Sequence, residues 1–168
     1  MMDLTTALIG LIIVAMCILP ILYFNAAQKK KRKKFLNDFL ALAGQQQLKV
    51  TQHEVWSNYC AIGIDSESNK LFYFKKRGDK EEQVLLSLLD IDKCRVINTK
   101  RTQNEDQIID RLELGLSFRN QRIPEKTLEF YSKDESMALD MELQLVEKWQ
   151  KLISAQLEGK RKAAALVS

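Results

Sequence analysis

The stretch "YCAIGIDSESNKLFYFKK", residues 59–76, carries the strongest fold signal in this chain. Its first part alternates, so that Cys60, Ile62 and Ile64 share one side of an extended backbone. The polar residues "DSESN" follow, which are typical of a turn, and "KLFYFKK" at 70–76 resumes the apolar pattern. The stretch therefore predicts a β-hairpin.

Further short strands are predicted on the C-terminal side of this hairpin, at "EQVLLSL", at 93–100 and at 126–132, where Leu128 and Phe130 point inward. The clearest is "DRLELGLSFR" at 110–119, which places Leu112, Leu114, Leu116 and Phe118 on one side and Arg111, Glu113, Ser117 and Arg119 on the other. Gly63 and Gly115 interrupt two of these strands, which predicts a bulge or a tight bend at each. About six antiparallel strands are expected.

A long amphipathic helix is predicted to close the chain. The residues "SKDE" at 132–135 fit a capping box at its start, and Gly159 is typical of a helix end. Trp149 is expected in the core rather than in a binding site. The apolar stripe comprises Ala138, Met141, Leu145, Trp149 and Leu152, broadened by Leu139, Val146 and Ile153.

The N-terminal region has a different composition. Residues 4–24 contain no charged residue, and about twenty such residues span a bilayer as a helix, which predicts a transmembrane anchor. A basic run follows, so we expect the N-terminus outside, the remainder in the cytoplasm and an inner-membrane, single-pass location. The run, interpreted as a topology signal and membrane-surface tether, comprises Lys29, Lys30, Lys31, Arg32, Lys33 and Lys34.

An amphipathic helix is predicted directly after the basic run, over residues 33–43. Its apolar face consists of Phe35, Leu36, Phe39, Leu40 and Ala43. This face fits either a membrane surface or the helix's own domain, and packing on the domain is favoured because the helix is short and has few aromatic residues.

The charge is divided unevenly along the chain. The whole chain has a formal net charge of +4, yet residues 51–158 hold sixteen Lys and Arg against twenty Asp and Glu. A nucleic-acid-binding module normally carries its basic residues on the folded unit, so this class is disfavoured. The predicted organisation is an anchor at 4–24, a basic and amphipathic segment at 25–50, one domain at 51–158 and a basic tail at 159–168.

The order of short antiparallel strands followed by one helix resembles the pleckstrin-homology (PH) superfold, and in particular bacterial PH-like domains. The resemblance rests on "AIGIDSESNKLFYFKK", on "LLDIDKCRVI" and on Trp149 in the closing helix. It implies a mainly β, or α+β, fold: a transmembrane helix, then a bent antiparallel barrel closed by the C-terminal helix. PH domains commonly hold phosphoinositides with basic residues around the first hairpin, whereas Asp65 and Glu67 occupy that loop here.

Basic residues gather elsewhere, and together with one acidic residue they form a set of candidate contacts for a partner. Most charged residues at loop tips are simply solvated, which is the competing interpretation. The candidate set is Lys75, Lys76, Arg77, Arg111, Glu113, Arg119 and Arg122.

The sequence predicts no catalytic residue, metal site or cofactor. His53 is the only histidine, and no nucleophile motif accompanies it. Cys60 and Cys94 lack the paired spacing of a zinc site, and the six glycines form neither a phosphate loop nor a dinucleotide fingerprint. A disulfide is not expected.

Three functions remain open at this stage. The first is a membrane-anchored, non-catalytic binding or scaffolding module whose partner is another protein, docked at a sheet edge or beside the closing helix. The second is a small accessory subunit of a larger membrane complex, and the third is a sensor of anionic lipid headgroups.

Overall fold

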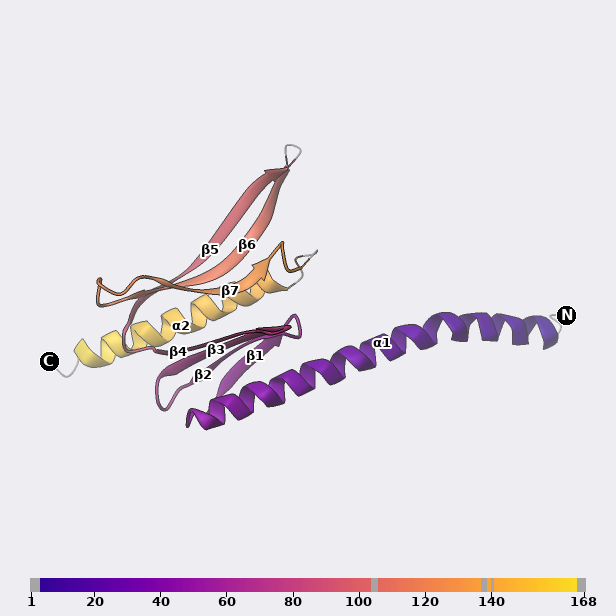
Figure 1. Ribbon diagram of the computed structural model, residues 1–168, viewed down its shortest axis with the longest axis horizontal. Helices are drawn as coiled ribbons and strands as arrows, with labels where there is room; N and C mark the ends of the chain where they lie inside the picture. The colour runs from indigo at the N-terminus through magenta and orange to yellow at the C-terminus, as the bar shows by residue number, and fades with distance from the viewer. Residues whose placement is uncertain (1–3, 104–105, 137–138, 140, 166–168) are drawn as a thin grey trace.

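The computed structural model describes residues 4–103, 106–136, 139 and 141–165. Within them, one long helix is followed by seven strands and a second helix (Figure 1). The elements are α1 (Leu4–Gln45), β1 (Gln52–Trp56), β2 (Cys60–Asp65), β3 (Lys70–Arg77), β4 (Lys80–Ser87), β5 (Ile91–Gln103), β6 (Asp106–Phe118), β7 (Lys126–Ser132) and α2 (Glu142–Ala165).

The strands form two antiparallel sheets, ordered β1-β2-β3-β4 and β5-β6-β7. The predicted hairpin is confirmed, since β2 and β3 pair in a continuous register that sets Ile62 opposite Tyr73. The predicted architecture of a transmembrane helix followed by one bent barrel is wrong. The fold is α+β, with two sheets and a C-terminal helix.

The central strands of the first sheet, β2 and β3, are largely buried on both faces. All six residues of β2 are buried, although its alternation predicted only one inward side. Cys60, Ile62 and Ile64 face the main core, while Ala61 faces the opposite way, toward α1. A strand with cover on both sides can carry apolar residues in succession.

The C-terminal part of α1 covers the outer face of this sheet. The rings of Phe35 and Phe74 stack with centroids 5.2 Å apart, and those of Phe39 and Phe72 at 5.3 Å. Of the two environments considered for the segment 33–43, the structure therefore shows its own domain. Leu40, by contrast, remains exposed.

Gly63 allows α1 to approach this closely. A Cβ at this position would lie 2.7 Å from Cγ1 of Val50 and 3.0 Å from Cζ of Phe39. The strand register is continuous through Gly63 and through Gly115, and the irregularities fall elsewhere, so neither glycine forms a bulge; the alternative, a tight bend, stays a prediction. Close packing, rather than a break in the ladder, requires glycine here.

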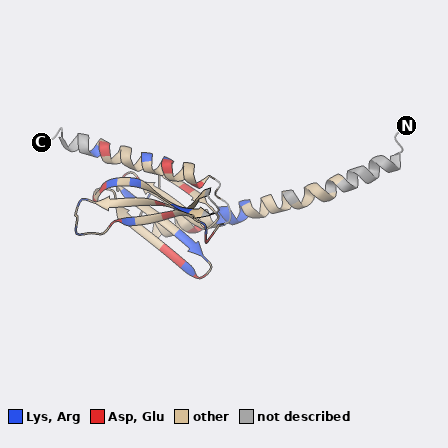
Figure 2. Ribbon diagram, turned by 90° about the horizontal axis from the view of Figure 1, so that it is seen from above, with Lys and Arg blue, Asp and Glu red and all other residues tan. Residues whose placement is uncertain are grey.

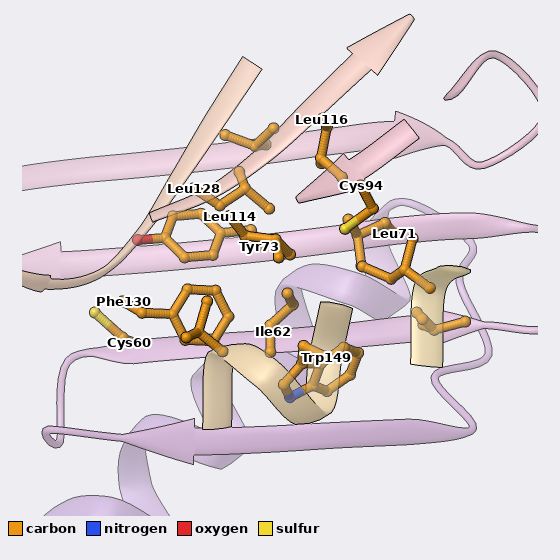
Figure 3. Close-up of a cluster of buried hydrophobic side chains, with 14 of the residues drawn as sticks. Cys60, Ile62, Leu71, Tyr73, Cys94, Leu114, Leu116, Leu128, Phe130 and Trp149 are labelled. Carbon is orange, nitrogen blue, oxygen red and sulfur yellow. The ribbon is translucent and has the colours of Figure 1, made fainter. Parts of the chain in front are cut away.

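The main core lies between the two sheets and α2. Val146, Trp149, Ile153 and Leu157 form the buried face of α2, and Trp149 is 1% exposed beside Ile62 (Figure 3). The indole N–H of Trp56 donates to the carbonyl oxygen of Phe130 at 2.9 Å, which ties the first sheet to the second. Trp149 thus has the core position expected of it.

The start of α2 differs from the prediction. Ser132 ends β7, and residues 132–136 form a turn in which the Ser136 N–H donates to the Ser132 carbonyl at 2.9 Å. The predicted capping box is therefore wrong, and α2 begins at Glu142 and continues past Gly159 to Ala165. The buried stripe of α2 runs through Val146, Trp149 and Ile153, whereas Met141 precedes the helix and is exposed; Ala138 lies outside the described residues.

The predicted membrane anchor is not supported. The apolar segment does not form a separate helix: α1 continues unbroken from Leu4 through the basic run to Gln45 and includes Pro20. In the part of the chain that the structure describes, no helix has the length and apolar character needed to cross a membrane. The predicted transmembrane helix, and the inner-membrane, single-pass location deduced from it, are corrected accordingly.

Candidate functional site

A groove lies where α1, β1 and the first turns of α2 meet. It encloses about 310 Å³. Apolar and charged side chains both contribute to its walls, which is typical of sites that recognise a ligand through a few polar contacts. The lining residues are Arg32, Glu54, Val55, Trp56, Ser57, Met141, Glu142, Gln144, Leu145 and Lys148.

β1 forms the floor of this groove. Among the described strands it pairs only with β2, so its other edge is free of a neighbouring strand. An edge strand presents backbone N–H and C=O groups that can pair with another chain. The guanidinium of Arg32 donates to the Val55 carbonyl at 2.6 Å, so α1 contributes a side chain directly at this edge.

The wall formed by α2 is partly apolar and partly charged. Met141 is 66% exposed and Leu145 is half-buried, so both present apolar surface to the groove. Glu142 is buried and accepts a hydrogen bond from Ser57 at 3.1 Å, while Lys148 is paired with Glu54 at 2.6 Å. The acidic groups of the groove are therefore already occupied.

A second hollow of about 330 Å³ continues along β1 and shares Arg32, Glu54 and Val55 with the groove. Its other lining residues are Lys29, Lys33, Leu36 and His53. Figure 2 shows basic residues concentrated on α1 where the helix reaches the sheets. We call the two hollows together the β1 groove.

Three of the predicted contact residues are brought together, but around carboxylates. The ammonium of Lys75 lies 2.6 Å from Glu129 and 2.8 Å from Glu135, and Arg77 also pairs with Glu135 at 3.5 Å. Arg111 reaches Glu129 at 3.9 Å. This cluster joins β3 to β7 and uses its charges internally.

Lys75 is the centre of that cluster. Its side chain is 14% exposed, and this burial alone would lower the pKa of the ammonium. The hydrogen bonds and negative charges of Glu129 and Glu135 outweigh the burial, so the pKa of Lys75 is raised above its usual value. Lys75 therefore stays charged and paired.

The other predicted contact residues do not join the cluster as a common basic surface. Lys76 pairs with Glu81 at 3.0 Å on the exposed hairpin. Glu113 lies opposite Glu129 in the β6–β7 register. Arg119 and Arg122 are exposed, at the end of β6 and in the loop that follows.

The two cysteines of the domain and its histidine lie in different environments. Cys60 and Cys94 are free but buried, and burial raises the pKa of each thiol to about 12, which opposes formation of a nucleophilic thiolate. His53 is exposed on β1. Within the described residues, no group of three or more His, Cys, Asp or Glu side chains is placed to hold a metal ion.

Sequence reasoning missed most of the β1 groove. Residues 52–56 were not assigned to a strand, and Met141 and Leu145 were assigned to the buried stripe of the last helix. The local signal in "QHEVW" is limited to its end, since Val55 and Trp56 are residue types enriched in strands. Arg32 was identified only as part of the basic run.

Comparison with protein-family models, with curated proteins and with solved structures found no match. The resemblance to PH-like domains stays a prediction made from the sequence.

Proposed function

We propose that this protein is a non-catalytic binding module that holds an extended segment of another polypeptide in the β1 groove. The observation that carries the proposal is the free edge of β1 between Arg32 of α1 and the exposed Met141 beside α2. A polypeptide added along a strand edge gains main-chain hydrogen bonds, and its side chains gain contacts with the walls.

The dimensions of the groove agree with such a ligand. A hollow of about 310 Å³ accommodates a few side chains and continues into the second hollow along the same strand. Val55 and Trp56 form a rigid floor because both are buried and Trp56 is fixed by its hydrogen bond to Phe130. A preformed floor lowers the entropic cost of ordering the partner.

Selection from a random peptide library on the full-length chain tests this function. We expect selected peptides to lose about tenfold or more in affinity when Met141→Glu places a charge in the groove. Ile123→Glu is the matched control, since Ile123 is also an exposed apolar residue but lies in the loop before β7. If no peptide is selected, or if both variants bind equally well, the proposed function is wrong.

A second candidate function rests on the N-terminal part of α1, which projects away from the sheets (Figure 1). Large apolar side chains there are 48% to 77% exposed, and contiguous exposed apolar surface marks interaction sites. We propose as this second candidate that the chain is a subunit of a larger protein complex assembled through that helix. The exposed residues are Val14, Met16, Ile18, Leu19, Leu22, Tyr23 and Phe24.

A photo-reactive residue at Leu19 tests the subunit function. We expect adducts with one defined polypeptide sequence, and their loss in a Leu22→Asp variant, because Leu22 lies one turn from Leu19 on the same helix. Adducts that persist when Leu22→Asp is added, or the absence of adducts when Leu22 is retained, would contradict this candidate.

The third function, a sensor of anionic lipid headgroups, gains no support from the candidate basic residues on β3. A headgroup site needs basic residues whose charge is available to a phosphate. Lys75, Lys76 and Arg77 are instead paired with Glu129, Glu81 and Glu135. We therefore do not propose a headgroup sensor at these positions.

A further inference from the structure

We infer that the ligand of the β1 groove is an acidic polypeptide segment, with one or more Asp or Glu residues beside α1 and an apolar residue beside α2. The inference rests on the proposed function and adds the chemistry of the partner. It follows from the different character of the two ends of the groove.

The end beside α1 is basic. Lys29, Arg32 and Lys33 stand at helical spacings of three and four residues, which places them on one side of α1. All three are exposed and line the hollow together with His53. The only acidic residue that lines this hollow is Glu54, and Glu54 is already paired with Lys148.

Arg32 is suited to receive a carboxylate. Its guanidinium forms no ion pair with any carboxylate that the structure describes, and one of its donors is used by the Val55 carbonyl. A guanidinium has about five N–H donors, so it can keep the bond to Val55 and still bind an acidic side chain. The segment would then pair with β1 and with Arg32 at the same time.

The end beside α2 selects an apolar residue. Met141 and Leu145 line it from α2 and its approach, and Trp56 lines it from β1. Glu142 is buried and hydrogen-bonded to Ser57, so it leaves the apolar surface as the main contact. Burial of an apolar side chain there contributes affinity, while the basic end contributes orientation.

The length of β1 sets the spacing within the ligand. His53 and Trp56 lie three residues apart on the strand, a distance of about 10 Å in an extended chain. Successive side chains of an extended ligand point to opposite sides, so an acidic residue facing α1 and an apolar residue facing α2 are separated by an odd number of positions, about one or three. This spacing is a property that selected sequences can be scored for.

Several basic residues elsewhere on the domain are already paired with carboxylates. Lys75 and Arg77 surround Glu135, Arg95 makes a two-pronged pair with Glu125, and Lys126 pairs with Glu82. Lys29 and Lys33 take part in none of the ion pairs found among the described residues. Lys29 and Lys33 thus combine the lack of an ion pair with a position beside the free strand edge.

Two measurements on the full-length chain test this inference. In the first, peptides selected from a random library are scored for Asp or Glu, and we expect enrichment at an odd spacing, about one or three positions, from an apolar residue. In the second, Lys29→Glu combined with Lys33→Glu is expected to weaken a selected peptide by about tenfold or more at low salt.

Lys31→Glu combined with Lys34→Glu is the matched control. These substitutions change the net charge equally, but both residues line a different surface of α1, away from β1. We expect the affinity of the selected peptide to stay within about twofold of the unsubstituted chain, since the charges lie on the far side.

The outcomes separate this inference from the proposed function. Peptides that bind, and that Met141→Glu weakens, but that lack acidic enrichment would overturn the acidic ligand and leave the binding module standing. The same holds if both charge-reversed pairs weaken binding equally, because the effect would then come from net charge alone. Failure to select any peptide overturns both.

Discussion

The two faces of the sheet β1-β2-β3-β4 are covered in different ways. The inner face meets the second sheet and α2 in a large cluster that includes Trp149, whereas the outer face meets the C-terminal part of α1 together with Leu48 and Val50 of the segment that follows. The second sheet and α2 both pack against the inner face. On the outer face, two stacked aromatic pairs and the close approach at Gly63 hold α1 in place. The inner face therefore secures the fold, and the outer face positions α1.

This difference has a functional meaning because α1 contributes Arg32 to the β1 groove. The position of Arg32 depends on Phe35 and Phe39, which lie one and two turns further along the same helix. The groove is thus assembled by the smaller and weaker of the two clusters. Four substitutions, from the largest expected effect to the smallest, separate the two faces.

Trp149→Ala is expected to have the largest effect, a loss of about 3 to 5 kcal/mol in the free energy of unfolding. Trp149 is 1% exposed at the centre of the inner cluster, so its removal leaves a cavity bounded by both sheets. Urea denaturation measures the loss. Trp149→Phe should cost less, since it keeps an aromatic ring and the indole N–H has no acceptor among the described residues. An unchanged midpoint for Trp149→Ala would contradict its role in the core.

Lys75→Met is expected to cost about 1 to 3 kcal/mol. The substitution leaves Glu129 and Glu135 without their shared partner in a poorly hydrated position between β3 and the second sheet. Denaturation at neutral pH measures the cost. Lys76→Met is the control, because its pair with Glu81 is exposed and should contribute little. Equal effects at the two positions would show that the cluster does not join the sheets.

Gly63→Ala is expected to destabilise the outer face by about 1 to 3 kcal/mol through overpacking. The new Cβ would meet Val50 and the ring of Phe39, so α1 must shift. Gly44→Ala is the control, since nothing lies within 4 Å of a Cβ there and alanine favours a helix. Hydrogen exchange of the α1 amides should rise for Gly63→Ala only. Faster exchange throughout the inner cluster would show that the two faces are not separable.

Asp65→Asn is expected to have the smallest effect, a loss of stability that is present at neutral pH and disappears in acid. Hydrogen bonds from the backbone N–H groups of Ser68, Lys49 and Glu67 lower the pKa of Asp65 to about 2, and they tie the segment after α1 to the β2–β3 turn. A lowered pKa stabilises the folded state above the unfolded pKa of 3.8, and this stability is lost as pH falls through about 2. Between these two pH values, the free energy of unfolding measured by denaturation should rise less steeply with pH for Asp65→Asn than for the unsubstituted chain. An identical pH dependence of the two proteins would contradict the lowered pKa of Asp65.

The strands were predictable where their alternation was long. Leu112, Leu114 and Leu116 are buried on one side of β6, and Leu128 and Phe130 on one side of β7, as the pattern indicated. The start of α2 was not predictable, because "SKDE" fits a helix cap as well as it fits the turn that it forms in the structure. Local pattern cannot choose between two motifs with the same hydrogen-bonding residues.

The candidate site was less predictable than the fold. The candidate basic residues come from local clusters and from the exposed side of a strand, and Lys75, Arg77 and Arg111 prove to be neutralised by Glu129 of β7 and Glu135 in the turn after it. Whether a charge is available to a ligand depends on partners that are far away in the sequence. Arg32 was visible as a residue but not as part of a groove.

By itself the sequence determined the hairpin at 59–76, the apolar side of each later strand and the core position of Trp149. These follow from the fixed period of side chains along a strand or helix. The tertiary structure decided which face α1 covers, why Gly63 is required and that β1 leaves its edge free beside Arg32. Each of these depends on the distance between segments that are remote in the chain, and no local period contains that distance.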